Sequence, residues 1–179
     1  MKVYTLRADV NTYRGVYYVN EDDVVDFNRR FQGKSGKKIW TGKEEFRFVP
    51  ADLPKGDFPG LSTHIPVFSY KAVKTLADLL EGNGQLFPIA CETENYFVFN
   101  VTRVIDALDE ANSDVERFSS GRIMDVDRYS FFPERVFGVH VFKIPELVLM
   151  DVFVTDPFVE RVKTAGLKGF KFRLVWTSD

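Results

Sequence analysis

The chain contains few of the residues that build disulfide-linked domains, metal sites and nucleophilic catalytic sites. Its 179 residues include one cysteine, Cys91, and two histidines, His64 and His140. A single cysteine cannot form an intramolecular disulfide, and with no histidine near it in sequence it supplies neither a local zinc site nor a redox pair. We therefore predict that Cys91 is buried as a small apolar residue, and we expect no metal and no cofactor.

Long apolar runs and a strong excess of one charge are absent as well. The richest apolar run, residues 148–154, is interrupted by Asp151 and is far shorter than the roughly 20 residues of a membrane-spanning helix. No apolar signal segment follows Met1. The formal net charge of −2 disfavours a nucleic-acid binder or a protein of anionic membrane surfaces. We expect a cytoplasmic protein with neither nucleic acid nor membrane as its partner.

What the chain has instead is apolar and aromatic bulk. Hydrophobic residues make up 45% of the sequence and aromatic residues 15%, with 18 phenylalanines. This composition is far from that of disordered proteins, and the length suits one core better than two. We predict a single domain over residues 1–179, in which residues 1–61 are weakly patterned and residues 62–179 form the better-defined core.

The most clearly patterned segment is 155–177. Asp156 can cap a helix that has Pro157 in its first turn, and Gly166 can end it in a left-handed conformation. The strand that follows has apolar residues at every second position, which we predict to share one face: Phe170, Phe172, Leu174 and Trp176.

Other segments predict further helices and strands. We expect initial strands in residues 1–19, a helix starting at Asn20 and ending at Gly33, and an excursion from the core over residues 34–61. Ser69 is predicted to cap a second helix. A hairpin with strands at residues 86–90 and 96–101 is predicted to follow, and then a short helix from Thr102. Additional strands are predicted at residues 123–126, 129–132, 139–144 and 152–154. The fold class is α+β, with a mixed or antiparallel sheet and a few packed helices.

Catalytic patterns are hard to find. A nucleophilic site needs a serine or cysteine within hydrogen-bond reach of a histidine that a third group orients. His64 lies in a turn-like segment, and His140 lies between two valines in a predicted strand. We predict structural roles for both and no catalytic residues, and keep a small hydrolase or nuclease that uses carboxylates with His64 or His140 as the alternative.

Several segments after residue 67 carry packing and turn motifs in a recognisable order. They are residues 68–73 with Leu76, Leu79 and Leu80, and residues 96–101, 144–145, 152–156 and 166–172. In this order the chain resembles a family of bacterial immunity proteins found beside polymorphic-toxin genes. The resemblance covers about 110 residues, whereas residues 1–61 match weakly, and it includes no catalytic signature.

This resemblance implies a cytoplasmic protein that binds and neutralises a specific toxin by stoichiometric association. Its function would then reside in a surface, of which two are candidates. Aromatic residues interrupt a loop-like region and resemble the anchors of protein interfaces: Trp40, Phe46 and Phe58. Acidic residues of the predicted short helix could meet a basic partner: Asp106, Asp109, Glu110 and Asp114.

Each surface has a simpler interpretation. Trp40 can pack as a satellite of the core, and the acidic residues can form a solvated face or, with Asp125 and Asp127, a metal site that their spacing does not require. A structural adaptor of a secretion or effector system is the other functional alternative. Homo-oligomerisation through an exposed phenylalanine-rich sheet face would be its signature.

Overall fold

The computed structural model describes residues 1–20, 24–36, 39–91 and 94–178, and no side chain from residue 90 to 94. The predicted helix start at residues 20–23 therefore lies partly outside the described residues, and the predicted burial of Cys91 concerns a side chain outside the described ones.

The described chain alternates short strands with short helices. The helices are α1 (Val24–Arg30), α2 (Tyr70–Thr75), α3 (Ala77–Leu80), α4 (Pro133–Val136) and α5 (Asp156–Thr164), with 3-10 helices η2 (Glu110–Asn112) and η3 (Pro145–Leu147). The strands are β1 (Lys2–Ala8), β2 (Gly15–Tyr18), β3 (Phe46–Val49), β4 (Val67–Ser69), β5 (Gly84–Cys91), β6 (Glu94–Val101), β7 (Asp114–Arg117), β8 (Ile123–Arg128), β9 (Val141–Phe142), β10 (Phe153–Thr155) and β11 (Phe170–Thr177).

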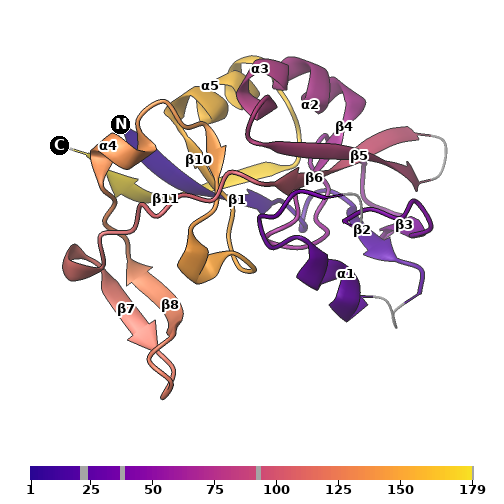
Figure 1. The fold of residues 1–179 in the computed structure, drawn as a ribbon. Coiled ribbons are helices and arrows are strands. Elements are labelled where there is room, and N and C mark those ends of the chain that lie inside the picture. Colours follow the sequence, from indigo (N-terminus) through magenta and orange to yellow (C-terminus); the bar gives the residue numbers. More distant parts are fainter. Residues whose placement is uncertain (21–23, 37–38, 92–93, 179) are drawn as a thin grey trace.

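The α+β class is confirmed, but the strands are divided among several sheets. Among the described residues there are four, with strand orders β11-β1-β10-β9, β4-β6-β5, β2-β3 and β7-β8, and every pairing of named strands is antiparallel. Figure 1 shows α2, α3 and α5 on one side of the two larger sheets, with α1 and the β7–β8 hairpin on the other. The predicted hairpin of residues 86–101 is the β5–β6 pair.

The first strand of the chain lies inside the sheet formed by the last strands. β1 pairs with β10 on one side and with β11 on the other, so that Val3 lies opposite both Thr155 and Trp176. The amino group of Met1 donates to Ser178 Oγ at 3.0 Å, and Figure 1 shows the two termini side by side. Because β1 lies between β10 and β11, the sheet of the C-terminal half depends on residues 2–8.

A β-bulge changes the predicted face of β11. Tyr4 lies opposite Leu174 and Val3 lies opposite Trp176, so Val175 is the extra residue of the bulge. One extra residue sends the following side chain to the other face of the sheet. Trp176 therefore packs against Phe131, with ring centroids 5.8 Å apart, and Leu174 is 50% exposed. The prediction of one shared face holds for Phe170 and Phe172 and is wrong for Trp176.

The helix ends that were predicted from local signals are largely confirmed. The Ser69 hydroxyl accepts a hydrogen bond from the Ala72 N–H at 3.1 Å. Gly166 has φ +62°, and the Leu167 N–H donates to the Val162 carbonyl at 3.1 Å, which is a Schellman ending. The prediction that Asp156 caps α5 is wrong. Its carboxylate instead accepts a hydrogen bond from the backbone N–H of Lys2 in β1 at 2.7 Å.

The short helix predicted from Thr102 does not form. Residues 102–109 form neither a helix nor a strand, and isolated bridges join Val104 to Lys143 and Leu108 to Phe131. The Asp109 N–H donates to the Ser130 carbonyl at 2.9 Å, so backbone groups that a helix would use locally are bonded to distant segments. Residues 129–132 likewise form a single bridge instead of a strand, and the strand predicted over 139–144 is limited to β9.

Candidate partner-binding surface

The β7–β8 hairpin projects from the body of the molecule as an arm (Figure 1). Two apolar side chains of β8, Ile123 and Val126, are 5% and 2% exposed and belong to a core cluster with Phe131 and Phe153. At the tip, the Arg122 guanidinium lies 4.9 Å from the centroid of the Phe118 ring, which is 42% exposed. The arm is thus held to the core through these two β8 side chains, while Phe118 and Arg122 at its tip are open to solvent.

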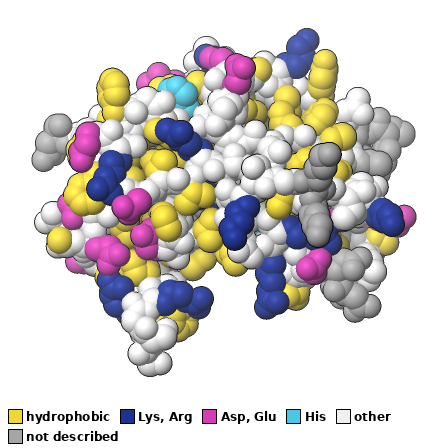
Figure 2. All heavy atoms as spheres, in the orientation of Figure 1, with side chains coloured by type: hydrophobic (Ala, Val, Ile, Leu, Met, Phe, Trp, Pro, Cys, Tyr) yellow, Lys and Arg dark blue, Asp and Glu magenta, His cyan; other side chains and the backbone are white. Residues whose placement is uncertain are grey.

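The arm belongs to the most acidic part of the chain. Residues 106–137, which we call the acidic lobe, contain eight acidic residues, four arginines and no lysine, a net charge of −4. The remainder of the chain therefore has a net charge of +2, since the whole chain has −2. Figure 2 shows acidic side chains gathered on the side of the molecule that carries the arm, with basic side chains among them.

The predicted acidic residues lie together at the base of the arm, and most of them are paired. Asp106 contacts Arg135 at 2.9 Å and Asp114 contacts Arg128 at 2.8 Å, while Glu110 pairs with Arg117. Asp109 accepts from the Asn112 side-chain amide at 2.7 Å. The hydrogen bond from Arg128 lowers the pKa of Asp114. Exposed pairs of this kind contribute little to stability, so a basic partner could compete for these carboxylates.

The aromatic residues predicted for the other surface lie mainly in the interior. Phe46 and Phe58 are 6% and 5% exposed. The half-buried Trp40 ring stacks on Phe46 at 6.2 Å and on Phe87 of β5 at 5.7 Å. Neither phenylalanine is accessible to a partner in this fold, and the packing interpretation of Trp40 agrees with its contacts.

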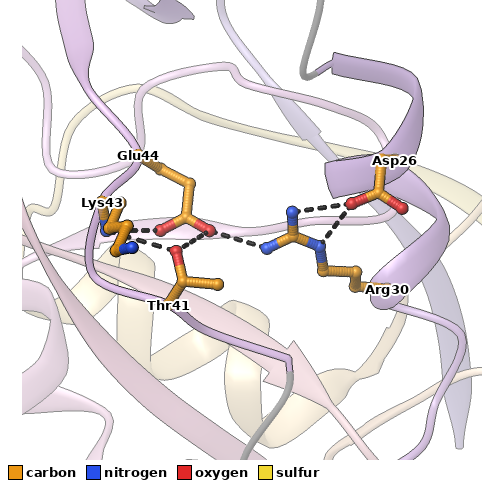
Figure 3. Close-up of polar contacts among 5 residues, drawn as sticks. All are labelled: Asp26, Arg30, Thr41, Lys43 and Glu44. Atoms are coloured by element: carbon orange, nitrogen blue, oxygen red, sulfur yellow. Dashed lines mark hydrogen bonds and ion pairs between the residues drawn. The ribbon is translucent and has the colours of Figure 1, made fainter.

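A polar network holds the loop that carries Trp40 (Figure 3). The Arg30 guanidinium of α1 lies 2.7 Å from Asp26 and 2.7 Å from Glu44, so it joins the helix to the loop. The Thr41 hydroxyl donates to the same Glu44 oxygen at 2.8 Å. The Glu44 side chain is only 7% exposed. The network therefore holds the loop in place and does not form a site that is open to a ligand.

His64 is buried in a local hydrogen-bonded arrangement. Its Nδ1 lies 2.8 Å from the Ser62 hydroxyl and its Nε2 lies 3.1 Å from the Asn28 carbonyl oxygen. Burial lowers the pKa of His64 to about 4. An efficient general base has a pKa near the working pH, so this imidazole is a weak base at neutral pH. The arrangement gives little support to the hydrolase alternative.

His140 is half-buried, and its two neighbours Val139 and Val141 are buried. Within the described part of the chain, no three histidine, cysteine, aspartate or glutamate side chains converge as a metal site would require.

Sequence reasoning missed two buried polar groups, Lys143 and Asn100. Both are 0% exposed. Lys143 Nζ donates to the Phe31 carbonyl at 2.8 Å, and the Asn100 side-chain amide donates to the Lys34 carbonyl at 2.9 Å. Burial lowers the pKa of Lys143 to about 7. A lysine inside the apolar run 139–144 was the signal that could have found it. Together these groups attach the segment after α1 to the C-terminal half.

A second surface has the opposite charge to the acidic lobe. A cleft of about 490 Å³ near the start of α2 is lined by Lys55, Lys71 and Lys168 around Asp57. Asp57 accepts from the Ser69 hydroxyl and from the Lys168 N–H, each at 2.8 Å. The carboxylate is therefore used within the fold, and the lysines make the cleft basic. The two surfaces would attract partners of opposite charge.

None of the described helices has the length and apolar character needed to cross a membrane. Compared with known families, residues 90–177 match the Immunity protein family (Imm11), which confirms the predicted relationship to immunity proteins. No curated protein matches the chain. The matched region contains β7 to β11 and the whole acidic lobe, whereas β1, the strand inside its sheet, lies outside it.

Proposed function

With residues 90–177 matched to the Imm11 immunity family, we propose that this protein binds a cognate bacterial toxin one-to-one and blocks its action in the cytoplasm of the cell that makes both. Residues 1–179 act as a single domain in this proposal, because β1 completes the sheet of the matched region. Neutralisation by binding needs no turnover. Covering the toxin's active site, or an essential surface next to it, is sufficient.

We place the toxin-binding surface on the acidic lobe. One observation carries this assignment: the segment with net charge −4 lies entirely inside the family-matched region. A standard interface takes about 800 Å² from each partner, which is under a tenth of the 9540 Å² accessible surface of this chain. We assign this interface to the lobe and its projecting arm.

The charges of the lobe favour a toxin with a basic surface. Complementary charges speed encounter, by about 10-fold or more at low salt, and they orient the two proteins before contact. Asp109 and Glu110 lie at the base of the arm, and neither belongs to the buried core. We expect reversal of their charge to alter the association rate more than the dissociation rate, because it acts mainly on the encounter of the two proteins.

Two observations favour this proposal over the alternative functions. The phenylalanine-rich face of β11 is covered by α5, because the Phe158 ring lies 6.3 Å from both Phe170 and Phe172. This face is therefore not exposed for self-association as an adaptor would require. His64, one of the two candidate bases of a hydrolase, is buried with its pKa lowered to about 4.

The first test is purification of the tagged protein from its native cells, with mass spectrometry of what co-elutes. A single toxin-like protein at near-equal stoichiometry would support the proposal. Recovery of the protein alone, or with copies of itself, when the neighbouring genes are expressed would contradict it.

The second test locates the surface. The double variant Asp109→Lys/Glu110→Lys should slow association with the toxin about tenfold at low salt and flatten its salt dependence. The control variant Lys71→Glu, in the basic cleft, should not slow association. An unchanged rate in the acidic variant would show that the lobe does not steer the toxin.

A further inference from the structure

Phe137 is the most exposed large apolar side chain in the described part of the chain. It is 82% exposed, compared with 60% for Val25, the next in order. Burying a phenylalanine side chain contributes about 2–3 kcal/mol, and exposing it forgoes this stabilisation. Isolated exposed apolar residues are common, so exposure by itself does not indicate a site. The backbone that holds Phe137, and the charges around it, distinguish this residue.

The backbone around Phe137 is fixed on both sides. Its N–H donates to the Pro133 carbonyl at 3.0 Å, which closes the single turn of α4, and the Val139 N–H donates to the Val136 carbonyl at 3.0 Å. Val136 is 0% exposed and anchors the turn in the core. Gly138 then turns the chain back with φ +73°, a conformation that favours glycine. The ring is thus presented to solvent from a rigid support.

A rigid support matters because binding is weakened by the ordering of mobile groups. Immobilising a flexible side chain costs about 0.5–1.5 kcal/mol, and loops add to this cost. A phenylalanine on a fixed turn loses little further freedom when a partner covers it. Aromatic residues presented in this way are typical of the central anchors of protein interfaces.

The surroundings of Phe137 are charged, and they belong to the acidic lobe. Arg135 forms the ion pair with Asp106 and also lies 4.7 Å from the Phe132 ring centroid, while Glu134 is exposed in the first turn of α4. The net charge of the lobe is −4. A polar, charged rim around one apolar anchor is the arrangement found in protein interfaces, and here the rim selects a basic partner surface.

We infer that Phe137 is the anchor of the toxin interface, and that it inserts into an apolar pocket of the toxin bordered by lysine or arginine side chains. The inference rests on the proposed function and adds to it the contact residue and the chemistry of the toxin's surface. In this arrangement the acidic lobe speeds association and orients the toxin, and burial of Phe137 slows dissociation of the complex. Affinity changes among variants of one interface arise mostly in the dissociation rate.

The test compares Phe137→Ala with the unchanged protein in binding to the co-purified toxin by surface plasmon resonance. We expect Kd to rise at least about 30-fold, mostly through faster dissociation, the factor that corresponds to about 2 kcal/mol of lost apolar burial. Leu174→Ala is the matched control, because Leu174 is also exposed, at 50%, on β11. The control should keep Kd within about threefold, and both variants should keep the thermal midpoint.

Two design points keep the outcomes distinct. Val3, Val136 and Trp176 share one core cluster, so both chain ends lie near the turn that carries Phe137, and the tag should be cleaved before binding is measured. If the unchanged protein binds the toxin and Phe137→Ala binds it within threefold of the same Kd, Phe137 is not the anchor, and the proposed function stands. If the unchanged protein binds no toxin, the proposed function fails and the anchor fails with it.

Glu134→Lys tests the basic border of the toxin pocket. We expect it to slow association and to weaken the dependence of the rate on salt, with little change in dissociation. Faster association of this variant would show an acidic border and would overturn that part of the inference.

Discussion

Replacing Lys143 with methionine should change how the stability of the protein depends on pH. The Lys143 ammonium is completely buried and donates to the Phe31 carbonyl. Burial lowers its pKa to about 7 from an ordinary value of 10.5. Between these two values the unfolded chain holds a proton that the folded chain has lost. Stability therefore rises with pH across this window, by up to about 1.4 kcal/mol per unit.

The expected magnitudes follow from this window. Keeping Lys143 buried at pH 7 costs about 4 kcal/mol relative to a side chain that does not titrate, and at pH 10 about 1 kcal/mol. Methionine removes this cost but leaves the Phe31 carbonyl without its donor, a loss of about 1–3 kcal/mol at every pH. Lys143→Met should thus be the more stable protein at pH 7 and the less stable one at pH 10, and the two curves should cross near pH 9.

Urea unfolding followed by tryptophan fluorescence, at intervals from pH 6.5 to pH 10, measures both curves. Burial raises the pKa of Tyr18 and of Tyr129, and these residues also affect stability in alkali, but they are common to both proteins and cancel in the difference. Lys163→Met, at an exposed position of α5, is the control, and its stability difference from the unchanged protein should be constant with pH. A difference between Lys143→Met and the unchanged protein that is constant with pH would refute the reasoning, because it would mean that Lys143 keeps its ordinary pKa.

Two other predictions concern stability. Folded His64 has its pKa lowered to about 4 from 6.5, so the unfolded chain binds a proton that the folded chain does not, and stability should fall by up to about 1.4 kcal/mol per unit as pH drops from 6.5 to 4. His64→Gln should lose most of this slope in urea titrations, and equal slopes would contradict the burial argument. Gly166→Val should lower stability by at least about 1–2 kcal/mol, because φ is +62° there, while Ala165→Val serves as the neighbouring control. An unchanged melting temperature would show that the helix ends without the left-handed residue.

Features fixed by neighbouring residues could be predicted from the sequence. The Ser69 cap joins groups three residues apart, the Gly166 ending joins groups five residues apart, and the β5–β6 hairpin joins adjacent segments. Such structures form wherever their residues occur, because their hydrogen bonds close within a few residues. The acidic lobe could also be located in the sequence, since its charge is a property of composition.

The other features of the fold depend on contacts between residues that are far apart in the chain. Asp156 bonds to Lys2 in place of its own helix, and the β1 register turns Trp176 to the opposite face from Phe172. The pairing of the acidic residues with arginines depends on the folding of the arm. The exposure of Phe137 depends on the tertiary packing, which buries the nearby Phe131 and leaves Phe137 in solvent. The sequence by itself determined the local turns, the apolar bulk and the charge asymmetry. Tertiary structure decided whether each side chain faces the core or the solvent. The reason is that segments far apart in sequence compete for the same hydrogen bonds and the same apolar surface only after they have come together.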